Sequence, residues 1–499
     1  MTRISDGAVG AGSTRAVEAS QLRMGESAAG PSVAIAGGGL AGLAGACALA
    51  DSGLRVTLFE RRPYLGGRAS SYEHPGTGEV VDNCQHVLFR VCTNLIEFYR
   101  RIGVEDKIRW YDDMTFIEPG GRRSVMHASP LPAPLHTAPS FLRFPFLNAK
   151  DKVAISGAIA ALTLATQRDT GKSFLEWCRG HHQTEAAIEL FWKPILVSAL
   201  SEDLDLISIS YAAQVVRESM KSPAARHMGV PAIPLTDLYN KAGDYIRSRG
   251  SEINFRTSLK TFCPTESEVR IRVSDKDSGS DGEECFDYLI LALPFNAIDP
   301  VLPEIPAAEP LREKLTHFES CPITGIHLWF DRQITDLDHA VLLNRTIQWM
   351  FHKSRLLITR DATSSSAATG SYIELVVSAS KNLIDKSRAE IVDLALNEVR
   401  EFFPAAGEAT LVKSAVIKEV HATYSPRPGI DAYRPGQTTP WPRVFLAGDW
   451  TATGWPATME GAVRSGYLAA EALVNAAGLK ARRFLAPDLP ASGLMRILR

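Results

Sequence analysis

Near the amino end, apolar and polar residues follow the pattern of a strand, a turn, a helix and a second strand. Residues 33–36 (VAIA) form a short apolar run, and the small apolar residues of 40–50 fit a helix that packs on a sheet. A second strand is predicted over 55–59, with Glu60 at its end. This order predicts a βαβ unit of an α/β fold.

The turn of this unit carries three glycines in the spacing G-x-G-x-x-G. Gly37 permits the tight turn, Gly39 lets the backbone approach a pyrophosphate, and Gly42 lets helix and strand pack closely. The helix therefore begins, at Leu40 and Ala41, with its N-terminus facing the phosphates. A plain β-turn-α unit without a ligand is the alternative.

The residues after the second strand favour FAD over a nicotinamide cofactor. Glu60 stands about 20 residues after the glycines, at a strand end, where a carboxylate accepts hydrogen bonds from ribose hydroxyls. Arg61, a second glycine pair (Gly66 and Gly67) and Arg68 follow. A nicotinamide domain needs no second phosphate-facing turn here, whereas an extended FAD does. The two arginines are predicted to contact phosphate or flavin, with a solvated surface role as the alternative.

A second motif lies close to the carboxyl end. The strand pattern RVFLAGDW at 443–450 leads to Gly448 and Asp449, and a helix is predicted over 459–474, starting at Thr458 and Met459. This geometry would bring a carboxylate to the ribityl or pyrophosphate region and a helix N-terminus to the flavin O2 side, where negative charge develops on reduction. A turn capped by an aspartate is the simpler interpretation.

Because the two motifs lie at opposite ends, the dinucleotide-binding domain must be discontinuous. A third part is predicted from a helix at 235–250 and strands at 253–262, 268–273 and 286–293, with a hairpin loop at 274–284; Leu259 on the first of these strands is a candidate cofactor contact. The second domain is expected to be mixed α+β, with strands at 323–330 and 372–377, a helix at 386–403 and a flexible loop at 363–370. The expected boundaries are 1–31 for a disordered leader, 32–121, 234–302 and 412–475 for FAD binding, 122–233 and 303–411 for the substrate domain, and 476–499 for a tail.

Composition narrows the class of protein. A chain of 499 residues is too long for a single compact core and should form two domains. Its net charge of −2 gives no electrostatic field that would recruit nucleic acid. Seven dispersed cysteines fit reduced thiols in a cytoplasm, and their spacing predicts no metal site. The first 32 residues lack the apolar core of a secretory signal, and no run reaches the roughly 18 apolar residues of a spanning helix.

The chain resembles FAD-dependent flavoproteins of the amine-oxidase and phytoene-desaturase type over 32–475. Within this group it is most similar to the hydroxysqualene dehydroxylases (squalene-associated desaturase-like proteins) of bacterial hopanoid biosynthesis. The broad motifs are GGGLAGLAGACAL, FERRPYLGGRASS and VFLAGDWTATGWPATMEGAVRSG, and the narrower ones are VVDNCQHVLFRVCTNLIEFYRRIG, LPAPLHTAPSFLRFP and FWKPILVSALSEDLDLISI.

The resemblance implies a Rossmann-like domain of the GR2 type and a reaction. The reaction is reductive removal of the hydroxyl of hydroxysqualene, giving squalene and water, with hydride from reduced FAD and electrons from an unidentified donor. FAD is expected to be non-covalent, because no Cys or His stands in an arrangement typical of attachment. The second domain is expected to hold a long apolar channel, with Gln85, Trp192 and Trp455 as candidate substrate contacts.

The departing hydroxyl needs an acid in a dry cavity, and the segment 82–86 offers the candidates. His86 or Asp82 would be the acid, and Cys84 would contact flavin or substrate. The simpler alternatives are that Asp82 caps a turn and that His86 binds the backbone. Desaturase relatives often carry glycine where this chain has Cys84. This difference weakens the inference of desaturase activity from the resemblance. The alternatives are a carotenoid-precursor desaturase, which runs hydride transfer in the opposite direction, and a non-enzymatic escort protein for prenylated partners.

A thirty-carbon substrate is insoluble, so the enzyme should collect it from a bilayer. Residues 139–147 are aromatic and apolar and are followed by Lys150 and Lys152, a composition that suits interfacial insertion. The expected location is cytoplasmic, at the inner face of the membrane and docked through 139–152. Intramolecular packing of the same residues is the alternative, and the role of the tail stays open.

Overall fold

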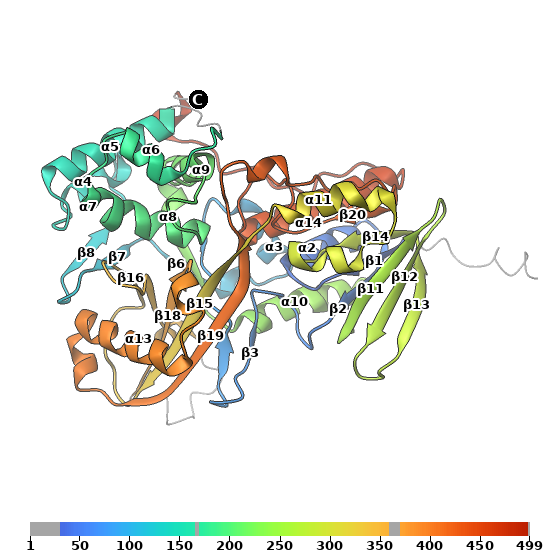
Figure 1. Ribbon diagram of the computed structural model, residues 1–499, viewed down its shortest axis with the longest axis horizontal. Coiled ribbons are helices and arrows are strands. Elements are labelled where there is room, and N and C mark those ends of the chain that lie inside the picture. The colour runs from blue at the N-terminus through green and yellow to red at the C-terminus, as the bar shows by residue number, and fades with distance from the viewer. Residues whose placement is uncertain (1–29, 165–168, 359–369, 498–499) are drawn as a thin grey trace, which may run out of the picture.

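The computed structural model describes residues 30–164, 169–358 and 370–497 (Figure 1). The predicted loop at 363–370 lies almost wholly outside these residues, and the predicted leader lies outside them except for its last two residues. Within the described residues, no helix combines the length and the apolar character needed to cross a membrane.

A five-stranded parallel sheet forms the core of the nucleotide-binding part. Its order is β10-β2-β1-β14-β20, and every neighbouring pair is parallel. The strands are β1 (Ser32–Ala36), β2 (Arg55–Glu60), β10 (Glu252–Phe255), β14 (Tyr288–Leu291) and β20 (Val444–Leu446). Chain segments from the amino end, the middle and the carboxyl end thus meet in one sheet, as the discontinuous domain predicted.

Two helices with small residues lie against each other beside this sheet. They are α2 (Leu40–Ala50) and α14 (Met459–Ala476), and they approach at Gly45 and Gly466. A Cβ on Gly466 would lie 2.1 Å from the carbonyl oxygen of Ala41, so only glycine permits this approach. Further helices of this part are α3 (Thr93–Arg101) and α10 (Leu235–Arg247).

The predicted strand at 253–262 is wrong as a single element. Arg256 adopts a left-handed φ of 55°, which ends β10 and lets β11 (Thr257–Pro264) enter another sheet. That antiparallel sheet also contains β12 (Val269–Asp275) and β13 (Asp281–Phe286). The predicted loop at 274–284 is wrong at its end, because residues 281–284 belong to β13, an exposed strand of mostly polar residues.

A seven-stranded sheet forms the base of the second part. Its order is β19-β15-β18-β17-β16-β7-β8, in which β7 and β16 are parallel and the other pairs antiparallel. The strands are β7 (Met114–Ile117), β8 (Arg123–Met126), β15 (Ser320–Phe330), β16 (His339–Leu342), β17 (Trp349–His352), β18 (Ser371–Ser378) and β19 (Leu411–Tyr424). This sheet takes β7 and nearly all of β19 from ranges expected to bind FAD.

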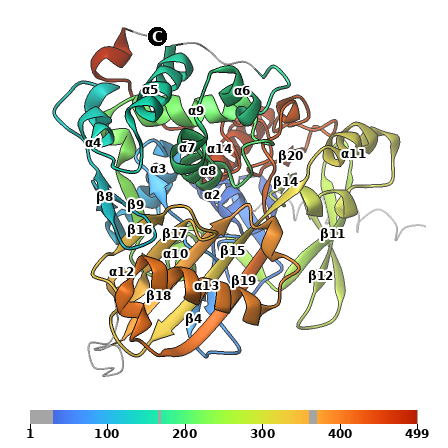
Figure 2. The ribbon, with the colours of Figure 1, turned by 60° about the vertical axis from the view of Figure 1, so that its left-hand side comes forward.

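The two faces of this sheet have different neighbours. The helix α13 (Arg388–Phe402) covers one face, where Ile326, Leu328, Ile373 and Leu375 pack in one apolar cluster (Figure 2). Alternation along β15 and β18 turns Gly325, His327 and Glu374 to the opposite face. This opposite face, which we call the inner face, lies toward residues 82–86, because a Cβ on Gly325 would lie 3.1 Å from the carbonyl oxygen of Asn83.

Helices form a layer at one end of the molecule (Figures 1 and 2). They are α4 (Ala138–Leu142), α5 (Ala149–Leu164), α6 (Phe174–Gly180), α7 (Glu185–Ala187), α8 (Lys193–Leu200) and α9 (Ile209–Met220). A large apolar cluster joins this layer to the inner face of the sheet.

Candidate functional site

The first turn needs glycine at two positions for different reasons. Gly37 has a φ of 110°, and a Cβ there would lie 2.4 Å from the carbonyl oxygen of Ala292 on the neighbouring strand. A Cβ on Gly42 would lie 1.9 Å from the carbonyl oxygen of Gly37. Gly39 differs, because a Cβ there would meet only the Cα of Gly67, at 3.9 Å. Gly39 therefore leaves open the space that a phosphate would use.

The start of α2 is free to bind an anion. Its N-cap is Gly39, no side chain caps it, and its first turn contains no acidic residue. The N–H groups of Leu40 and Ala41 have no partner within the helix, as in every α-helix. Together with the helix dipole, these donors fit a pyrophosphate.

Glu60 is placed as a ribose-binding carboxylate would be. Its Oε2 accepts a hydrogen bond from the N–H of Gly38 (2.7 Å), and its Oε1 accepts one from the N–H of Arg62 (2.8 Å). Each carboxylate oxygen can accept a further hydrogen bond. The backbone thus fixes a buried carboxylate at the end of β2, and lone pairs remain for ribose hydroxyls.

The second glycine pair docks directly on the first turn. The N–H of Gly66 donates to the carbonyl of Gly38 (2.9 Å), and Gly66 and Gly67 have φ values of 103° and 61°. Nη1 of Arg62 donates to the carbonyl of Gly67 (2.7 Å). Arg61, by contrast, is exposed. Arg62, which the sequence analysis did not single out, therefore helps to hold this pair.

Arg68 connects the two sequence-distant motifs. Its Nη2 forms an ion pair with Oδ1 of Asp449 (2.8 Å), and its Nη1 donates to the carbonyl of Ala422 (2.8 Å). Asp449 follows Gly448, whose φ is 146° and whose N–H donates to Oγ of Ser465 (2.8 Å). One arginine thus joins β19, the second glycine pair and the start of the carboxyl-terminal motif.

The carboxyl-terminal helix holds this motif through Ser465 and has its own side-chain cap. Thr458 is the N-cap of α14, and its Oγ1 accepts a hydrogen bond from the N–H of Gly461 (3.1 Å). The Sδ of Met459 lies 3.6 Å from the hydroxyl of Tyr239 on α10. The remaining predicted cofactor contact, Leu259, is buried on β11 beside a register shift against β12.

A buried arginine that the sequence analysis missed organises the loop 449–455. The guanidinium of Arg434 donates to the carbonyls of Thr451 (2.5 Å) and Trp455 (2.7 Å) and to the hydroxyl of Tyr211 (2.8 Å). It also lies over the ring of Tyr424, 5.4 Å from its centre. A single arginine between Tyr433 and a proline has no spacing signal that would reveal this role.

The segment 82–86 lies against the inner face with three different protonation environments. Burial raises the pKa of Asp82, but Lys353 at 2.6 Å and hydrogen bonds from Ser71 and Leu235 outweigh it and lower that pKa. Burial raises the pKa of Cys84 well above its usual value and lowers that of His86, whose Nδ1 contacts the carbonyl of Cys84 (2.7 Å). Asp82 is therefore held as an anion, which argues against it as a proton donor.

Lys353 is the centre of a buried polar cluster on the inner face. Its Nζ donates to Oδ2 of Asp82 (2.6 Å) and Oε1 of Gln85 (2.8 Å), and lies 3.5 Å from Oε2 of Glu374. His327 is the cross-strand partner of Glu374, and its Nδ1 contacts the hydroxyl of Tyr372 (2.9 Å). Lys353, Glu374 and His327 were not predicted as site residues, because only the strand register brings them to Asp82.

The predicted substrate contacts have different surroundings. Gln85 belongs to the Lys353 cluster. Trp192 is 1% exposed, and its Nε1 donates to Oε1 of Gln183 within the helical layer (2.9 Å). Trp455 is partly exposed, with the guanidinium of Arg464 over its ring. Only Gln85 is thus brought to the polar cluster.

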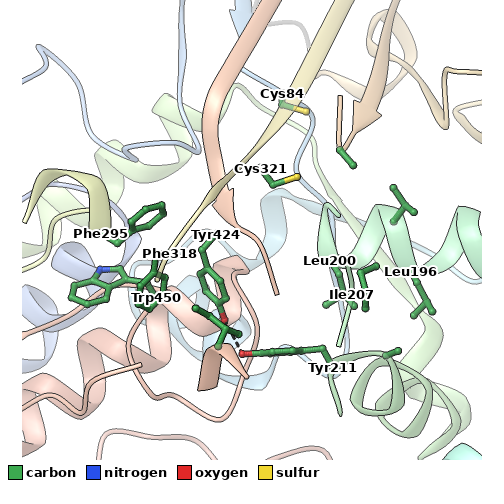
Figure 3. Close-up of a cluster of buried hydrophobic side chains, with 14 of the residues drawn as sticks. Cys84, Leu196, Leu200, Ile207, Tyr211, Phe295, Phe318, Cys321, Tyr424 and Trp450 are labelled. Carbon is green, nitrogen blue, oxygen red and sulfur yellow. Dashed lines mark hydrogen bonds between the residues drawn. The ribbon is translucent and has the colours of Figure 1, made fainter. Parts of the chain in front are cut away.

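Apolar side chains from many segments converge next to this cluster. Figure 3 shows Cys84, α8, α9 and the loop at Trp450 contributing to one buried group. Its labelled members are Cys84, Leu196, Leu200, Ile207, Tyr211, Phe295, Phe318, Cys321, Tyr424 and Trp450. The polar end of the inner face is therefore bordered by an extensive apolar region.

The predicted membrane-inserting segment 139–147 is largely packed inside. Phe141 and Phe144 are 7% and 1% exposed, and both contact other aromatic rings of the helical layer. Leu142, by contrast, is 60% exposed. The two phenylalanines therefore pack inside the helical layer, and Leu142 is the exposed apolar side chain of this segment.

The parallel sheet, the two glycine turns and the buried ribose-type carboxylate define a dinucleotide-binding flavoprotein. Comparison with known proteins identifies the family. Residues 40–474 match the flavin containing amine oxidoreductase family, and the chain belongs to it. The cofactor is therefore FAD, the fold class predicted from the sequence is confirmed, and the protein is an FAD-dependent oxidoreductase.

The relatives of the chain include carotenoid desaturases. The chain is 28% identical to 15-cis-phytoene desaturase of Synechococcus elongatus over 92% of its own length and 99% of that protein. It is also 28% identical to zeta-carotene desaturase of Synechocystis sp., over 89% and 97% of the two chains. Among solved structures, putrescine oxidase bound to putrescine matches 90% of this chain and 98% of its own with a TM-score of 0.67 and 16% identity, which concerns the fold alone.

Proposed function

We propose that the protein exchanges a hydride with a long isoprenoid hydrocarbon, and that its first candidate reaction is desaturation of a carotenoid precursor. The observation that carries this proposal is the match, over nearly full length, to two carotenoid desaturases. Bound FAD supplies the hydride acceptor for such a reaction. The apolar region of Figure 3 supports a hydrocarbon ligand, because most of its side chains are apolar and the hydroxyls of Tyr211 and Tyr424 are paired with each other.

The chain's own residues would bind, orient and exclude water. Gly37 to Gly42, Glu60, Gly66 to Arg68 and Asp449 would hold the cofactor. Arg434 would keep the loop 449–455 in place, and the apolar cluster would keep water away from the reacting carbon. An escort protein for prenylated partners has no use for this set of cofactor residues, so we do not favour that role.

A second candidate reaction is the reductive dehydroxylation of hydroxysqualene to squalene. The observation that favours it is the buried polar cluster around Glu374 and His327, which a pure hydrocarbon would leave without partners. The hydroxyl of an alcohol could form hydrogen bonds with Glu374 and His327. This reaction would need FAD in its reduced form, with the electrons supplied by a separate electron donor.

Incubation with each substrate in the absence of oxygen distinguishes the two reactions. Protein loaded with oxidised FAD is mixed with phytoene in detergent, and dithionite-reduced protein is mixed with hydroxysqualene. Flavin bleaching together with a product lighter by two hydrogens supports desaturation. Flavin reoxidation together with squalene supports dehydroxylation. Turnover of neither would reject the proposed substrate class.

We also propose that the protein docks on the inner face of a cytoplasmic membrane. The exposed apolar side chains at one end of the molecule support this proposal: Leu131, Leu135, Leu142, Val153, Leu494 and Ile497. The carboxyl-terminal segment is tied to this end, since the N–H of Leu494 donates to the carbonyl of Ala133 (2.9 Å). Lys150 and Arg496, both exposed, would face anionic lipids.

A further inference from the structure

Two fully buried polar side chains share the inner face of the seven-stranded sheet, and some of their polar atoms have no hydrogen-bond partner. His327 on β15 and Glu374 on β18 are both 0% exposed and lie opposite each other in the antiparallel register. Among the described residues, neither carboxylate oxygen of Glu374 nor Nε2 of His327 has a hydrogen-bond partner. Such groups are costly to bury and call for an explanation, for example a ligand that completes their hydrogen bonds.

Competition for Lys353 sets the charge of Glu374. The Nζ of Lys353 lies 2.6 Å from Asp82 but 3.5 Å from Glu374, so Asp82 takes the close ion pair. Burial raises the pKa of Glu374 to about 8, with Lys353 lowering it and Asp82 raising it. Of two carboxyl groups beside one lysine, Asp82 is thus the anion and Glu374 the neutral acid at pH 7, the separation of roles typical of acid–base sites.

The neighbouring titratable groups leave this assignment unchanged. Burial, followed by the charge of Lys353, lowers the pKa of His327 to about 3, so the imidazole is neutral. Burial raises the pKa of Tyr372 and of Cys84 well above their usual values, so both are neutral. The cluster therefore contains one charged pair, Asp82 and Lys353, beside neutral hydrogen-bonding groups.

The surroundings of this pair fit the polar end of an otherwise apolar ligand. A Cβ on Gly325 would lie 3.1 Å from the carbonyl oxygen of Asn83 and 3.6 Å from Nε2 of His327, so glycine lets the segment 82–86 pack directly against the inner face beside His327. Phe351 is the neighbour of Glu374 on β17, and with Trp349 it belongs to the large apolar cluster. A single hydroxyl on a hydrocarbon chain would match a polar pair set at the border of an apolar region.

We propose that Glu374 and His327 bind the hydroxyl of an isoprenoid alcohol, and that Glu374 donates the proton with which this hydroxyl leaves. The inference rests on the second reaction of the proposed function. The carbon–oxygen bond breaks, the oxygen leaves as water with the proton of Glu374, and the carbon takes the hydride that reduced flavin supplies. Glu374 is left as a carboxylate beside Lys353 and regains its proton from water.

Infrared difference spectroscopy of the oxidised holoenzyme tests binding without turnover. At pH 7 we expect a protonated-carboxyl C=O band that is absent in Glu374→Gln and retained in Glu398→Gln, a matched change of a buried glutamate outside the site. Hydroxysqualene, but not squalene, should shift this band. Absence of the band, or a band that hydroxysqualene leaves unmoved, would overturn the inference.

Kinetics with reduced enzyme tests the proton donor. Glutamine still offers an N–H to the hydroxyl but has no proton to give, so Glu374→Gln should lower kcat for dehydroxylation by at least about 100-fold with little change in KM. His327→Phe should raise KM. Dehydroxylation by Glu374→Gln at the wild-type rate, or loss of FAD from this variant, would contradict the role. If the wild type forms no squalene, the second reaction itself fails, and the band shift alone then decides whether the alcohol site exists.

Discussion

At the scale of single residues, the neutral state of Glu374 makes stability depend on pH. Burial raises its pKa to about 8, whereas glutamate in an unfolded chain titrates near about 4.3. The contribution of Glu374 to stability is therefore complete below its pKa in the unfolded chain, and it is lost as pH rises through its pKa in the folded protein. Relative to Glu374→Gln, the free energy of unfolding of the wild type should fall by about 1.4 kcal/mol per pH unit between about pH 5 and pH 8.

Urea denaturation of both proteins across this range measures the difference. Buried histidines contribute with the opposite sign, because burial lowers the pKa of His339 and His352 to about 4. Their contribution to stability is present above the pKa of histidine in the unfolded chain and is lost as pH falls. Because both proteins contain these histidines, this contribution cancels in the comparison. A difference that stays constant with pH would mean that Glu374 is ionised in the folded protein.

Arg68 and Arg61 offer a matched pair of substitutions. Arg68 is joined to Asp449 and Ala422, whereas Arg61 is exposed. Arg68→Met leaves the buried carboxylate of Asp449 without its cation, so we expect FAD retention to weaken by at least about tenfold. Arg61→Met should retain FAD. The ratio of flavin to protein absorbance after gel filtration measures both, and equal retention would show that the ion pair does not support the cofactor site.

Residues that act within one local structural unit could be predicted from the sequence. Residues that are brought together by the pairing of distant strands could not. Gly37, Gly42 and Glu60 act within one βαβ unit, so their spacing alone revealed them. Lys353 reaches Asp82 across 271 positions, and Glu374 joins them only because β18 pairs with β15 and β17. Sequence patterns specify which face of a strand is buried, but not which strand lies beside it.

At the scale of elements, the contact between α2 and α14 depends on a glycine. A Cβ on Gly466 would lie 2.1 Å from the carbonyl of Ala41, and no flexible side chain could move to make room. Gly466→Ala should therefore destabilise the protein by about 2–3 kcal/mol. In Gly157→Ala, the new Cβ on α5 meets nothing within 4 Å, so helix propensity should raise stability by up to about 1 kcal/mol.

Thermal unfolding of the two alanine variants gives the comparison. If both variants melt together with the wild type, α14 does not need close contact with α2. Since Ser465 on α14 accepts a hydrogen bond from the N–H of Gly448, next to Asp449, displacement of α14 should also reduce FAD content. The prediction thus links helix packing to the site.

The elements flanking the glycine motifs matched expectation better than those farther away. The helix predicted over 40–50 is α2, and the helix predicted over 459–474 is α14, two residues longer. The break at Arg256 was missed, because a left-handed arginine leaves the alternation of apolar residues nearly intact. Likewise, the polar sequence of β13 carries no strand signal, since this strand is exposed along most of its length.

At the scale of the whole molecule, three distant chain segments form one nucleotide-binding sheet, and the inserted segments form the second part. The motifs at the two ends of the chain predicted this discontinuity. They could not place β7 and β19, which join the seven-stranded sheet through pairing with β16 and β15. The carbonyl of Ala422 on the long strand β19 accepts a hydrogen bond from Arg68, so this strand connects the second part to the second glycine pair.

The arrangement of exposed apolar side chains at this scale leads to the last prediction. Leu142 on α4 is 60% exposed, and Ile497 near the carboxyl end is 80% exposed. The helix α4 and the carboxyl end of the chain lie at the same end of the molecule (Figures 1 and 2). Burial of a leucine side chain contributes about 1.5–3 kcal/mol, so Leu142→Asp should weaken binding to anionic lipid vesicles by about tenfold or more. Val80→Asp changes a side chain of similar exposure (52%) on β4 (Val80–Asp82), away from the helical layer, and should leave binding unchanged.

Vesicle sedimentation measures the binding, and turnover of detergent-delivered substrate provides the internal check. Leu142→Asp should retain full activity in detergent and lose it when the substrate is embedded in vesicles, because only delivery from the bilayer requires docking. Equal loss with both substrate forms would indicate damage to the fold instead. Vesicle binding by Leu142→Asp and Val80→Asp to the same extent would place the membrane contact elsewhere, and the apolar end of the helical layer would then need another partner to cover it.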